Sequence, residues 1–167
     1  MYKLKILKHS EISKNILEDI IRIKSIAWPY SYNKQIDWIN KNLKDSDLHI
    51  LLLEGEEPVA YLNLISIDFI LDNYKYSGFG IGNVCTIEKK KGYGKLIIQL
   101  TAQYLSEKNK IGLLLCKPEL VNFYKRYGWT VIKKSKLCLS FDNRDIEMML
   151  INHKSTISKL TFSGQAF

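Results

Sequence analysis

The segment Val84–Leu96 allows few local arrangements, because an apolar strand end runs into a short basic loop and then into a helical pattern. Leu96, Ile97 and Leu100 recur at helical spacing after the loop. The first backbone N–H groups of such a helix have no partner within it, and with the positive end of the helix dipole they suit a phosphate group. Glycine lets the backbone approach a ligand closely. The segment therefore predicts an anion site, with members Lys89, Lys90, Lys91, Gly92, Tyr93, Gly94 and Lys95.

Two common phosphate-binding motifs do not fit this loop. Gly92 and Gly94 are too close together for a P-loop, and no Ser or Thr follows Lys95. The loop is also not a complete G-x-G-x-x-G fingerprint, because position 97 is Ile97. A lysine-rich loop that only caps a helix would explain the same residues, since short glycine motifs recur by chance. The choice between these readings depends on the rest of the chain.

Length and composition describe an ordinary globular protein. The chain has 167 residues, of which 46% are hydrophobic and 25% charged, enough to bury one core. We find no internal repeat and no linker, and we expect a single domain over residues 1–167. Met1–Ser10 lacks the apolar run of a secretory signal, and no apolar run is long enough to cross a bilayer. We therefore expect a cytoplasmic protein without membrane contact.

The histidines and cysteines predict no metal site. The three histidines are scattered, at His9, His49 and His153, and no C-x-x-C or H-x-x-x-H spacing occurs. The three cysteines lie within apolar segments, at Cys85, Cys116 and Cys138. We expect reduced thiols in or near the core.

The net charge of +8 comes almost wholly from lysine, since the only arginines are Arg22, Arg126 and Arg144. Positive charge attracts nucleic acid, an anionic surface or a phosphate-bearing cofactor. A protein that reads nucleic acid usually favours arginine for its bidentate contacts. Because only Lys89–Lys91 forms a local cluster, we expect no nucleic-acid partner.

Hydrophobic periodicity predicts one α/β domain around a mixed sheet. The expected strands cover residues 2–8, 47–54, 59–71, 74–87, 111–116, 129–133, 136–141 and 145–152. The expected helices cover residues 10–27, 33–43, 92–108 and 119–127, with Ser10 as the first cap and Gly128 as the last stop. Glycines at 78, 80 and 82 interrupt the long strand, which marks a bulge or a close approach of a ligand or another backbone.

Two motifs then coincide. The Lys89–Gly94 loop precedes a long amphipathic helix, and about thirty residues later Asn122–Trp129 forms a short helix closed by Gly128. This pairing resembles the GNAT superfamily of acyl-CoA-dependent N-acyltransferases, whose Q/R-x-x-G-x-G/A loop binds pyrophosphate and whose F-Y-x-x-x-G-F/W element follows. The resemblance covers most of the chain. It implies a single-domain GNAT-like α/β fold, with a mixed, mostly antiparallel twisted sheet of six to seven strands and about four helices.

The resemblance also implies roles for particular residues. Gly82, Asn83 and Val84 would form the strand end that pairs with the pantetheine arm, and the Val84 N–H would face the thioester carbonyl. Lys89 to Gly94 would wrap the pyrophosphate, with Lys95 beside it. Tyr124 would act as the general acid near the cofactor sulfur. Its alternative is an ordinary tyrosine packed on an amphipathic helix.

The sequence departs from the family pattern at two positions and lacks an obvious base. Lys89 replaces the usual Gln or Arg, and Thr86 stands where many members have proline. Residues 79–87 contain no carboxylate. Asp68, acting through a water, and the terminal carboxylate of Phe167 are the candidates, the latter because the chain end is similar to that of aminoglycoside 2′-N-acetyltransferases. A frayed tail explains the same chain end.

The function implied is that of a bacterial-type N-acetyltransferase, an acyltransferase for groups other than aminoacyl groups. It would use acetyl-CoA and a small-molecule primary amine, and a homodimer is left open. A protein or peptide amine is the alternative acceptor. A basic nucleic-acid-binding domain without chemistry is a further alternative, but it leaves Tyr124 and the interrupted strand unexplained. The acceptor amine, the oligomeric state and the physiological role are not readable from the sequence.

Overall fold

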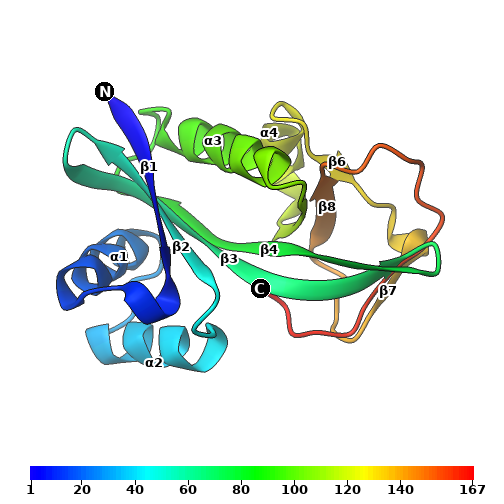
Figure 1. Ribbon diagram of the computed structural model, residues 1–167, viewed down its shortest axis with the longest axis horizontal. Coiled ribbons are helices and arrows are strands. Elements are labelled where there is room, and N and C mark those ends of the chain that lie inside the picture. The colour runs from blue at the N-terminus through cyan, green and yellow to red at the C-terminus, as the bar shows by residue number, and fades with distance from the viewer. The chain divides into compact units, whose positions relative to one another are not determined.

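The computed structural model describes residues 1–167, which divide into two compact units. Unit 1 comprises Met1–Ile65 and Gly82–Thr101, and unit 2 comprises Ser66–Ile81 and Ala102–Phe167. The chain passes between the units within three elements (Figure 1), which are β3 (Glu57–Leu71), β4 (Tyr74–Thr86) and α3 (Tyr93–Glu107). The expectation of a single domain stays a prediction.

Unit 1 contains an antiparallel sheet whose register fixes which side chains share a face. β1 (Tyr2–Lys8) pairs along its whole length with β2 (Leu48–Glu54), and β2 pairs with the first part of β3. The end of β4 follows, where the Ile87 N–H donates to the Val59 carbonyl at 2.9 Å. His49 of β2 lies directly opposite Asn63 of β3. Since alternate residues of a strand point to the same face, Tyr61 and Asn63 share that face with His49.

Two helices cover this face of unit 1. Figure 1 shows α1 (Lys14–Ala27) and α2 (Tyr32–Asn42) on one side of the strands and the start of α3 on the other. The hydroxyl of Ser13 accepts from the Ile16 N–H at 3.4 Å, which caps α1. The expected cap, Ser10, is wrong, because Ser10 lies in the short 3-10 helix η1 (His9–Glu11) that precedes α1.

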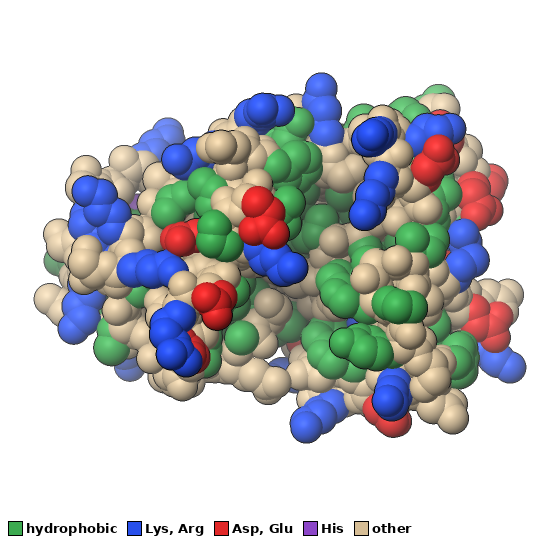
Figure 2. Space-filling view, turned by 180° about the vertical axis from the view of Figure 1, so that it is seen from behind, with side chains coloured by type: hydrophobic (Ala, Val, Ile, Leu, Met, Phe, Trp, Pro, Cys, Tyr) green, Lys and Arg blue, Asp and Glu red, His purple; other side chains and the backbone are tan.

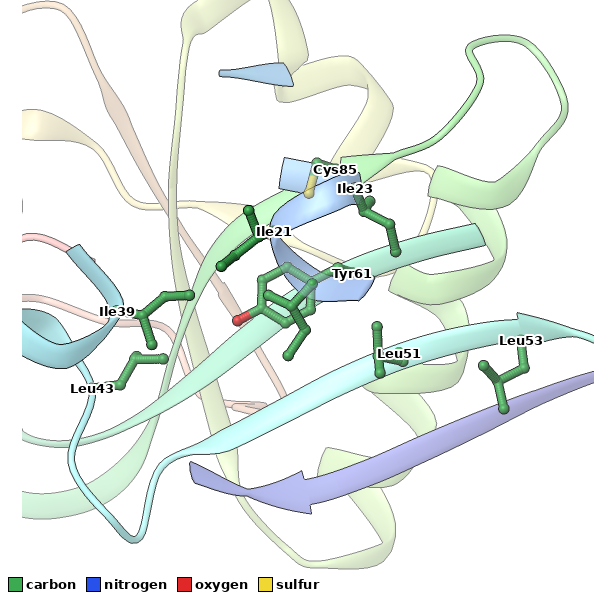
Figure 3. Close-up of a cluster of buried hydrophobic side chains, with 9 residues drawn as sticks. Ile21, Ile23, Ile39, Leu43, Leu51, Leu53, Tyr61 and Cys85 are labelled. Atoms are coloured by element: carbon green, nitrogen blue, oxygen red, sulfur yellow. The ribbon is translucent and has the colours of Figure 1, made fainter. Parts of the chain in front are cut away.

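The core of unit 1 forms where α1 and α2 meet the strands. Its buried members are Ile20, Ile21, Ile23, Ile39, Leu43, Leu51, Leu53, Tyr61 and Cys85. Figure 3 shows the Tyr61 ring in the middle of this cluster, with its hydroxyl end on the side of Ile39 and Leu43 rather than of Leu53. Removal of such apolar surface from water is worth about 25 cal/mol per Å2, so this cluster holds both helices on the sheet.

Unit 2 contains a mixed sheet in the order β7-β9-β3-β4-β5-β8-β6. β4 pairs with β5 in parallel, as β7 does with β9, whereas the pairs β3–β9, β5–β8 and β6–β8 are antiparallel. The strands not yet named are β5 (Ile111–Cys116), β6 (Thr130–Val131), β7 (Leu137–Leu139), β8 (Glu147–Ile151) and β9 (Leu160–Phe162). Gly78 is needed where β4 meets β5, because a side chain there would strike the Ile111 carbonyl oxygen.

The helical turns of unit 2 are short. They are η2 (Pro118–Leu120), α4 (Val121–Lys125) and η3 (Lys134–Lys136). Gly128 has a φ of +85°, which closes the turn after α4 as expected. The core of unit 2 gathers around Phe69, Leu113, Leu150, Leu160 and Phe162.

The predicted fold class is confirmed. The chain has four α-helices and a mixed, mostly antiparallel open sheet, although that sheet has nine strands rather than six to seven. The expected strand at 129–133 shortens to β6, and that at 136–141 to β7. β9 was not predicted, because three residues within a polar tail give no readable alternation. Cys138 is exposed, which corrects the expectation of a thiol in or near the core, while Cys85 and Cys116 are buried.

On the face drawn in Figure 2, lysine side chains do not gather in one region. Figure 2 shows blue Lys and Arg side chains dispersed over the visible face, with acidic side chains between many of them. Several of these lysines form exposed ion pairs, such as Lys3 with Glu56 and Lys14 with Glu18. Exposed pairs of this kind contribute little stability. On this face the positive charge is therefore dispersed.

Candidate active site

The end of β4 carries an irregular backbone at the expected place. Asn83 has a φ of +54° within the strand, a left-handed conformation that Asn tolerates better than most residues. Its side-chain amide donates to Asn63 Oδ1 at 2.6 Å, which fixes the turn of the backbone against β3. Such a residue turns the next peptide out of the regular strand. Val84, the expected oxyanion donor, follows directly and is half-buried.

The loop after β4 presents its backbone to solvent. Lys90 and Gly92 have φ values of +68° and +82°, and a Cβ on Gly92 would meet no atom within 4 Å. α3 begins at Tyr93, and the Leu96 N–H donates to the Gly92 carbonyl. The N–H groups of the first turn therefore have no acceptor within the helix. Open backbone at a helix start suits a phosphate group.

Three exposed lysines surround this loop, Lys89, Lys90 and Lys91. Lys91 Nζ lies 3.5 Å from Glu88 Oε2, an exposed pair within the loop. The lysines supply mobile positive charge of the kind that a phosphate group attracts.

The Tyr93 side chain contacts residues of unit 1 outside the loop. Its hydroxyl donates to Glu54 Oε2 at 2.8 Å, and this hydrogen bond, with burial, raises the pKa of Tyr93 to about 12. The ring is buried and meets Tyr2 edge-on. Within the expected cofactor site, Tyr93 can therefore offer its backbone N–H but not its hydroxyl. The side chain instead ties the start of α3 to the end of β2.

Tyr124, the expected general acid, is buried in unit 2. Burial, and to a smaller extent nearby Cys116, raises the pKa of Tyr124 to about 12. The ring packs edge-on against Phe123 and Trp129, and the backbone carbonyl accepts from the N–H of Trp129 at 3.4 Å. The phenol is therefore held rigidly and stays protonated at neutral pH, as an acid requires.

The chain end is folded onto β4 in unit 2. A Cβ on Gly80 would lie 2.6 Å from the Phe167 ring, which also packs edge-on against Phe162. The Ser140 hydroxyl donates to the Gly164 carbonyl at 2.9 Å. A frayed tail does not describe these contacts. The terminal carboxylate is thus carried by a residue whose ring packs on Gly80 of β4.

Asp68, the other candidate base, lies elsewhere in unit 2. Its carboxylate accepts from the Ser77 hydroxyl at 2.6 Å, and it lines a surface pocket of about 400 Å3 with Lys75 and Thr161 among others. Tyr124 is not among the residues that line this pocket.

A polar row on the buried face of unit 1 was not predicted. His9 Nδ1 lies 3.0 Å from His49 Nε2, and His49 Nδ1 lies 2.9 Å from the Tyr61 hydroxyl. Asn63, opposite His49, continues the row to Asn83. Strand alternation could have placed Tyr61 and Asn63 on one face, but the partner strand and its register are not visible in the sequence.

Neither metal ligation nor a membrane span is indicated. No group of three or more His, Cys, Asp or Glu side chains is placed to hold a metal ion. None of the helices is both long enough and apolar enough to span a bilayer.

Comparison with known proteins identifies the class. Residues 9–132 match the family described as acetyltransferase (GNAT) domain. This match spans more than half of the 167 residues, and the chain belongs to the GNAT acetyltransferase family. It is an N-acetyltransferase, and the family implies an acyl-CoA donor. A search of curated proteins finds no match.

Solved structures of low sequence identity share the fold. Escherichia coli ElaA is 20% identical, with 90% of this chain and 99% of ElaA covered at a TM-score of 0.62. An acyl-CoA N-acyltransferase from Pseudomonas aeruginosa is 15% identical, with coverage of 90% and 99% and a TM-score of 0.65. An N-acetyltransferase from Staphylococcus aureus Mu50 is 16% identical, with coverage of 90% and 97% and a TM-score of 0.63. Identities this low support the fold alone.

Proposed function

We propose that this protein transfers an acetyl group from acetyl-CoA to the primary amine of a small molecule. The observation that carries the proposal is the segment from Asn83 to Gly94, where a left-handed strand residue leads into an open, lysine-rich loop at a helix start. Membership of the GNAT family gives this segment its ligand class. Gly82, Asn83 and Val84 are proposed to bind the pantetheine arm, and Lys89–Lys95 to bind the pyrophosphate.

Acetyl-CoA, when bound, supplies a thioester carbonyl that the neutral amine attacks. A C–N bond forms, the C–S bond breaks, and one proton leaves the amine nitrogen. The Val84 N–H is proposed to donate to the carbonyl oxygen as its negative charge develops, and one such donor is worth about 3 kcal/mol. The rest of the acceleration comes from holding the two reactants together.

Tyr124 is proposed to protonate the departing thiolate. Its pKa of about 12 keeps it protonated at neutral pH, while an ordinary thiol has a pKa of about 8.5. The raised value lowers the driving force for donation to the thiolate, so Tyr124 acts as a hydrogen-bond donor that gives up its proton only as the C–S bond breaks. The phenolate then recovers a proton from solvent.

For the base, Phe167 is proposed through its terminal carboxylate, with Asp68 acting through a water as the alternative. The packing of the Phe167 ring on Gly80 supports a carboxylate in a defined position rather than on a mobile tail. Asp68 is exposed and hydrogen-bonded to Ser77.

The acceptor is proposed to be a small amine rather than a strongly polycationic one. The net charge of +8 disfavours a polycation such as an aminoglycoside, in spite of the similarity of the chain end to that branch. An amine of a protein or peptide is the second candidate acceptor. A cytoplasmic location is proposed with the first reading, since acetyl-CoA is made and used inside cells.

Calorimetric titration with acetyl-CoA, followed by a steady-state assay with a panel of amines, tests the function. Tyr124→Phe is expected to lower kcat by about 10²- to 10⁴-fold while acetyl-CoA binding changes less than threefold. Phe123→Leu is the matched control beside it, because it perturbs the same aromatic cluster without removing a hydroxyl. Absence of binding to the wild type at millimolar acetyl-CoA would contradict the proposed function, and equal losses of binding and turnover would remove Tyr124 from the acid role.

A further inference from the structure

A second basic region lies in unit 2, in a surface pocket with a volume of about 360 Å3. Its lining residues come from two parts of the chain, between positions 130 and 136 and between positions 150 and 157. Figure 1 shows the chain after β6 and the chain after β8 at the same end of unit 2. The pocket shares no residue with the Asn83–Lys95 segment, and neither Tyr124 nor Phe167 lines it.

The ionisable side chains of this pocket are all basic. Lys133, Lys136 and Lys154 line it together with His153, and no Asp or Glu does. None of the three lysines forms an ion pair with a carboxylate. Positive charges gathered without counterions repel one another, and an anion bound among them removes that repulsion. The charge of the pocket therefore selects an anionic ligand.

Hydrogen-bond donors also outnumber acceptors in the pocket. The ammonium group of Lys136 donates to the Ile157 carbonyl, which holds it between the two parts of the chain. An ammonium group has three donors, so two of them remain for a ligand. The exposed hydroxyls of Ser155 and Thr156 lie on the same loop, and no backbone N–H of residues 153–157 donates to another backbone group. Such a lining suits a ligand with several acceptor oxygens.

The floor of the pocket is apolar. Ile132 and Leu150 are buried in the core of unit 2 and still line the pocket, with the half-buried Val131 and Ile157 beside them. A bare inorganic anion gains nothing from such a floor, whereas an apolar group placed on it is removed from water. The volume lies near the lower end of the range of small-molecule sites, about 300–1,000 Å3. The pocket therefore suits a small ligand with an apolar part.

The loop between β8 and β9, which forms one wall, is fixed at both of its ends. At the first end, the side-chain amide of Asn152 donates to the Lys110 carbonyl at 3.1 Å. At the other end, Asp72 Oδ1 accepts from the backbone N–H groups of Ser158 and Lys159 at 2.8 and 2.7 Å. A wall that is already in place does not have to be ordered when a ligand binds.

We propose that this pocket binds a small phosphate ester whose organic part is apolar. A phosphate ester carries a charge of about −1.5 to −2 at neutral pH and three strong acceptor oxygens. A carboxylate has a single charge and two oxygens, which match three lysines less well. The phosphate lies among Lys133, Lys136 and Lys154, and the organic part covers Ile132 and Leu150. This site is additional to the one proposed for acetyl-CoA.

Calorimetric titration with phenyl phosphate at 150 mM salt tests the site, because this probe joins a phosphate to an apolar ring. Lys136→Gln keeps a donor for Ile157 but removes the charge, and it should weaken binding about tenfold. Lys154→Gln changes only an exposed loop residue and should weaken binding about threefold. Lys134→Gln is the matched control and should bind within twofold of wild type, since Lys134 pairs with Glu147 and neither residue lines the pocket.

Two further measurements distinguish the pocket from the loop proposed to bind coenzyme A. The variant with Lys89, Lys90 and Lys91 changed to glutamine should bind phenyl phosphate within twofold of wild type. Lys136→Gln should bind acetyl-CoA as the wild type does. Inorganic phosphate should bind the wild type at least threefold more weakly than phenyl phosphate, because it leaves the apolar floor in contact with water.

Four results would overturn the proposal. The first is no saturation of the wild type by phenyl phosphate at about 10 mM, and the second is an equal loss of binding in Lys134→Gln and Lys136→Gln. Loss of phenyl phosphate binding in the Lys89–Lys91 variant would assign the probe to that loop, and weaker acetyl-CoA binding by Lys136→Gln would make the pocket part of the cofactor site. Equal affinities for inorganic phosphate and phenyl phosphate would contradict the apolar part of the ligand.

Discussion

Lys24 is a buried cation without an acidic partner. The side chain is 2% exposed, and its Nζ lies 4.1 Å from the centroid of the Trp38 ring on α2. No carboxylate forms an ion pair with it, and burial lowers the pKa of Lys24 to about 8, an effect partly offset by Cys85. The cation–π contact with Trp38 recovers only part of the desolvation cost. Lys24 therefore lowers the stability of unit 1 at neutral pH.

Lys24→Met is expected to raise the free energy of unfolding at pH 7 by about 1–3 kcal/mol, because methionine fills a similar volume without a charge. The folded pKa of about 8 lies below the ordinary value of 10.5, so the unfolded state binds more protons between these pH values. Stability of the wild type should consequently rise from pH 8 toward pH 10.5, and that rise should be smaller in the variant. Urea denaturation at pH 7 and at pH 10 measures both effects.

Lys14→Met is the matched control, because Lys14 is an exposed lysine at the start of the same helix. It should leave the free energy of unfolding within about 0.5 kcal/mol of wild type at both pH values. A Lys24→Met variant less stable than wild type at pH 7 would show that the ammonium group makes a stabilising contact instead.

At the scale of single elements, β4 depends on small residues in two different ways. A side chain at Gly78 would strike a backbone atom, the Ile111 carbonyl oxygen of β5. A side chain at Gly80 would strike only the ring of Phe167, which ends the chain. Backbone within a paired strand cannot move without breaking the pairing, whereas a terminal ring can turn aside. Gly78 therefore leaves the space that β4 and β5 need to pair, and Gly80 leaves the space that the Phe167 ring occupies.

Gly78→Ala should accordingly lower the free energy of unfolding by more than Gly80→Ala, by about 3 kcal/mol against about 1 kcal/mol. Chemical denaturation of both variants measures the difference. The double variant Gly80→Ala/Phe167→Ala should be no less stable than Phe167→Ala alone, since the clash has been removed. Equal costs for the two glycine variants would mean that β5 yields as easily as the tail.

For the whole molecule, the sequence predicted those features that depend on local pattern. The periodicity of residues 2–8 and 111–116 gave β1 and β5 with their observed bounds, and glycine spacing located the loop before α3. Ser10 and Ser13 both precede the same apolar pattern, and only the turn at η1 shows that Ser13 is the cap. β9 gave no signal because its three residues are stabilised by β3 and β7, which lie far away in sequence.

The candidate site, like the fold, was predictable only where it depends on local sequence pattern. The loop and the strand end around Asn83 follow from nearby glycines and lysines. The polar row does not, because His9, His49 and Asn63 meet only through the register of three strands. Asn63 Nδ2 is buried without a hydrogen-bond partner. This too results from packing, since nothing in an isolated strand shows whether an amide finds a partner. The sequence therefore predicted the features that depend on neighbouring residues, and it did not predict those that depend on the pairing of distant strands.

The dispersed charge of the molecule separates cofactor binding from general attraction to polyanions. Each exposed lysine adds to the long-range potential wherever it lies, and salt weakens this term over a distance of about 8–10 Å. Lys89, Lys90 and Lys91 add to the same potential but also surround the open backbone at the start of α3. Their removal should therefore affect coenzyme A far more than it affects a generic polyanion.

Replacement of Lys89, Lys90 and Lys91 by glutamine lowers the net charge from +8 to +5, since three positive charges are removed. This variant should bind acetyl-CoA at least tenfold more weakly in calorimetry at 150 mM salt. A control with Lys5, Lys34 and Lys159 changed to glutamine has the same net charge and should bind within twofold of wild type. Both variants should show the same weak, salt-sensitive binding to single-stranded DNA in fluorescence anisotropy. Loss of DNA binding in the loop variant alone, with acetyl-CoA binding intact, would instead assign the loop to nucleic acid.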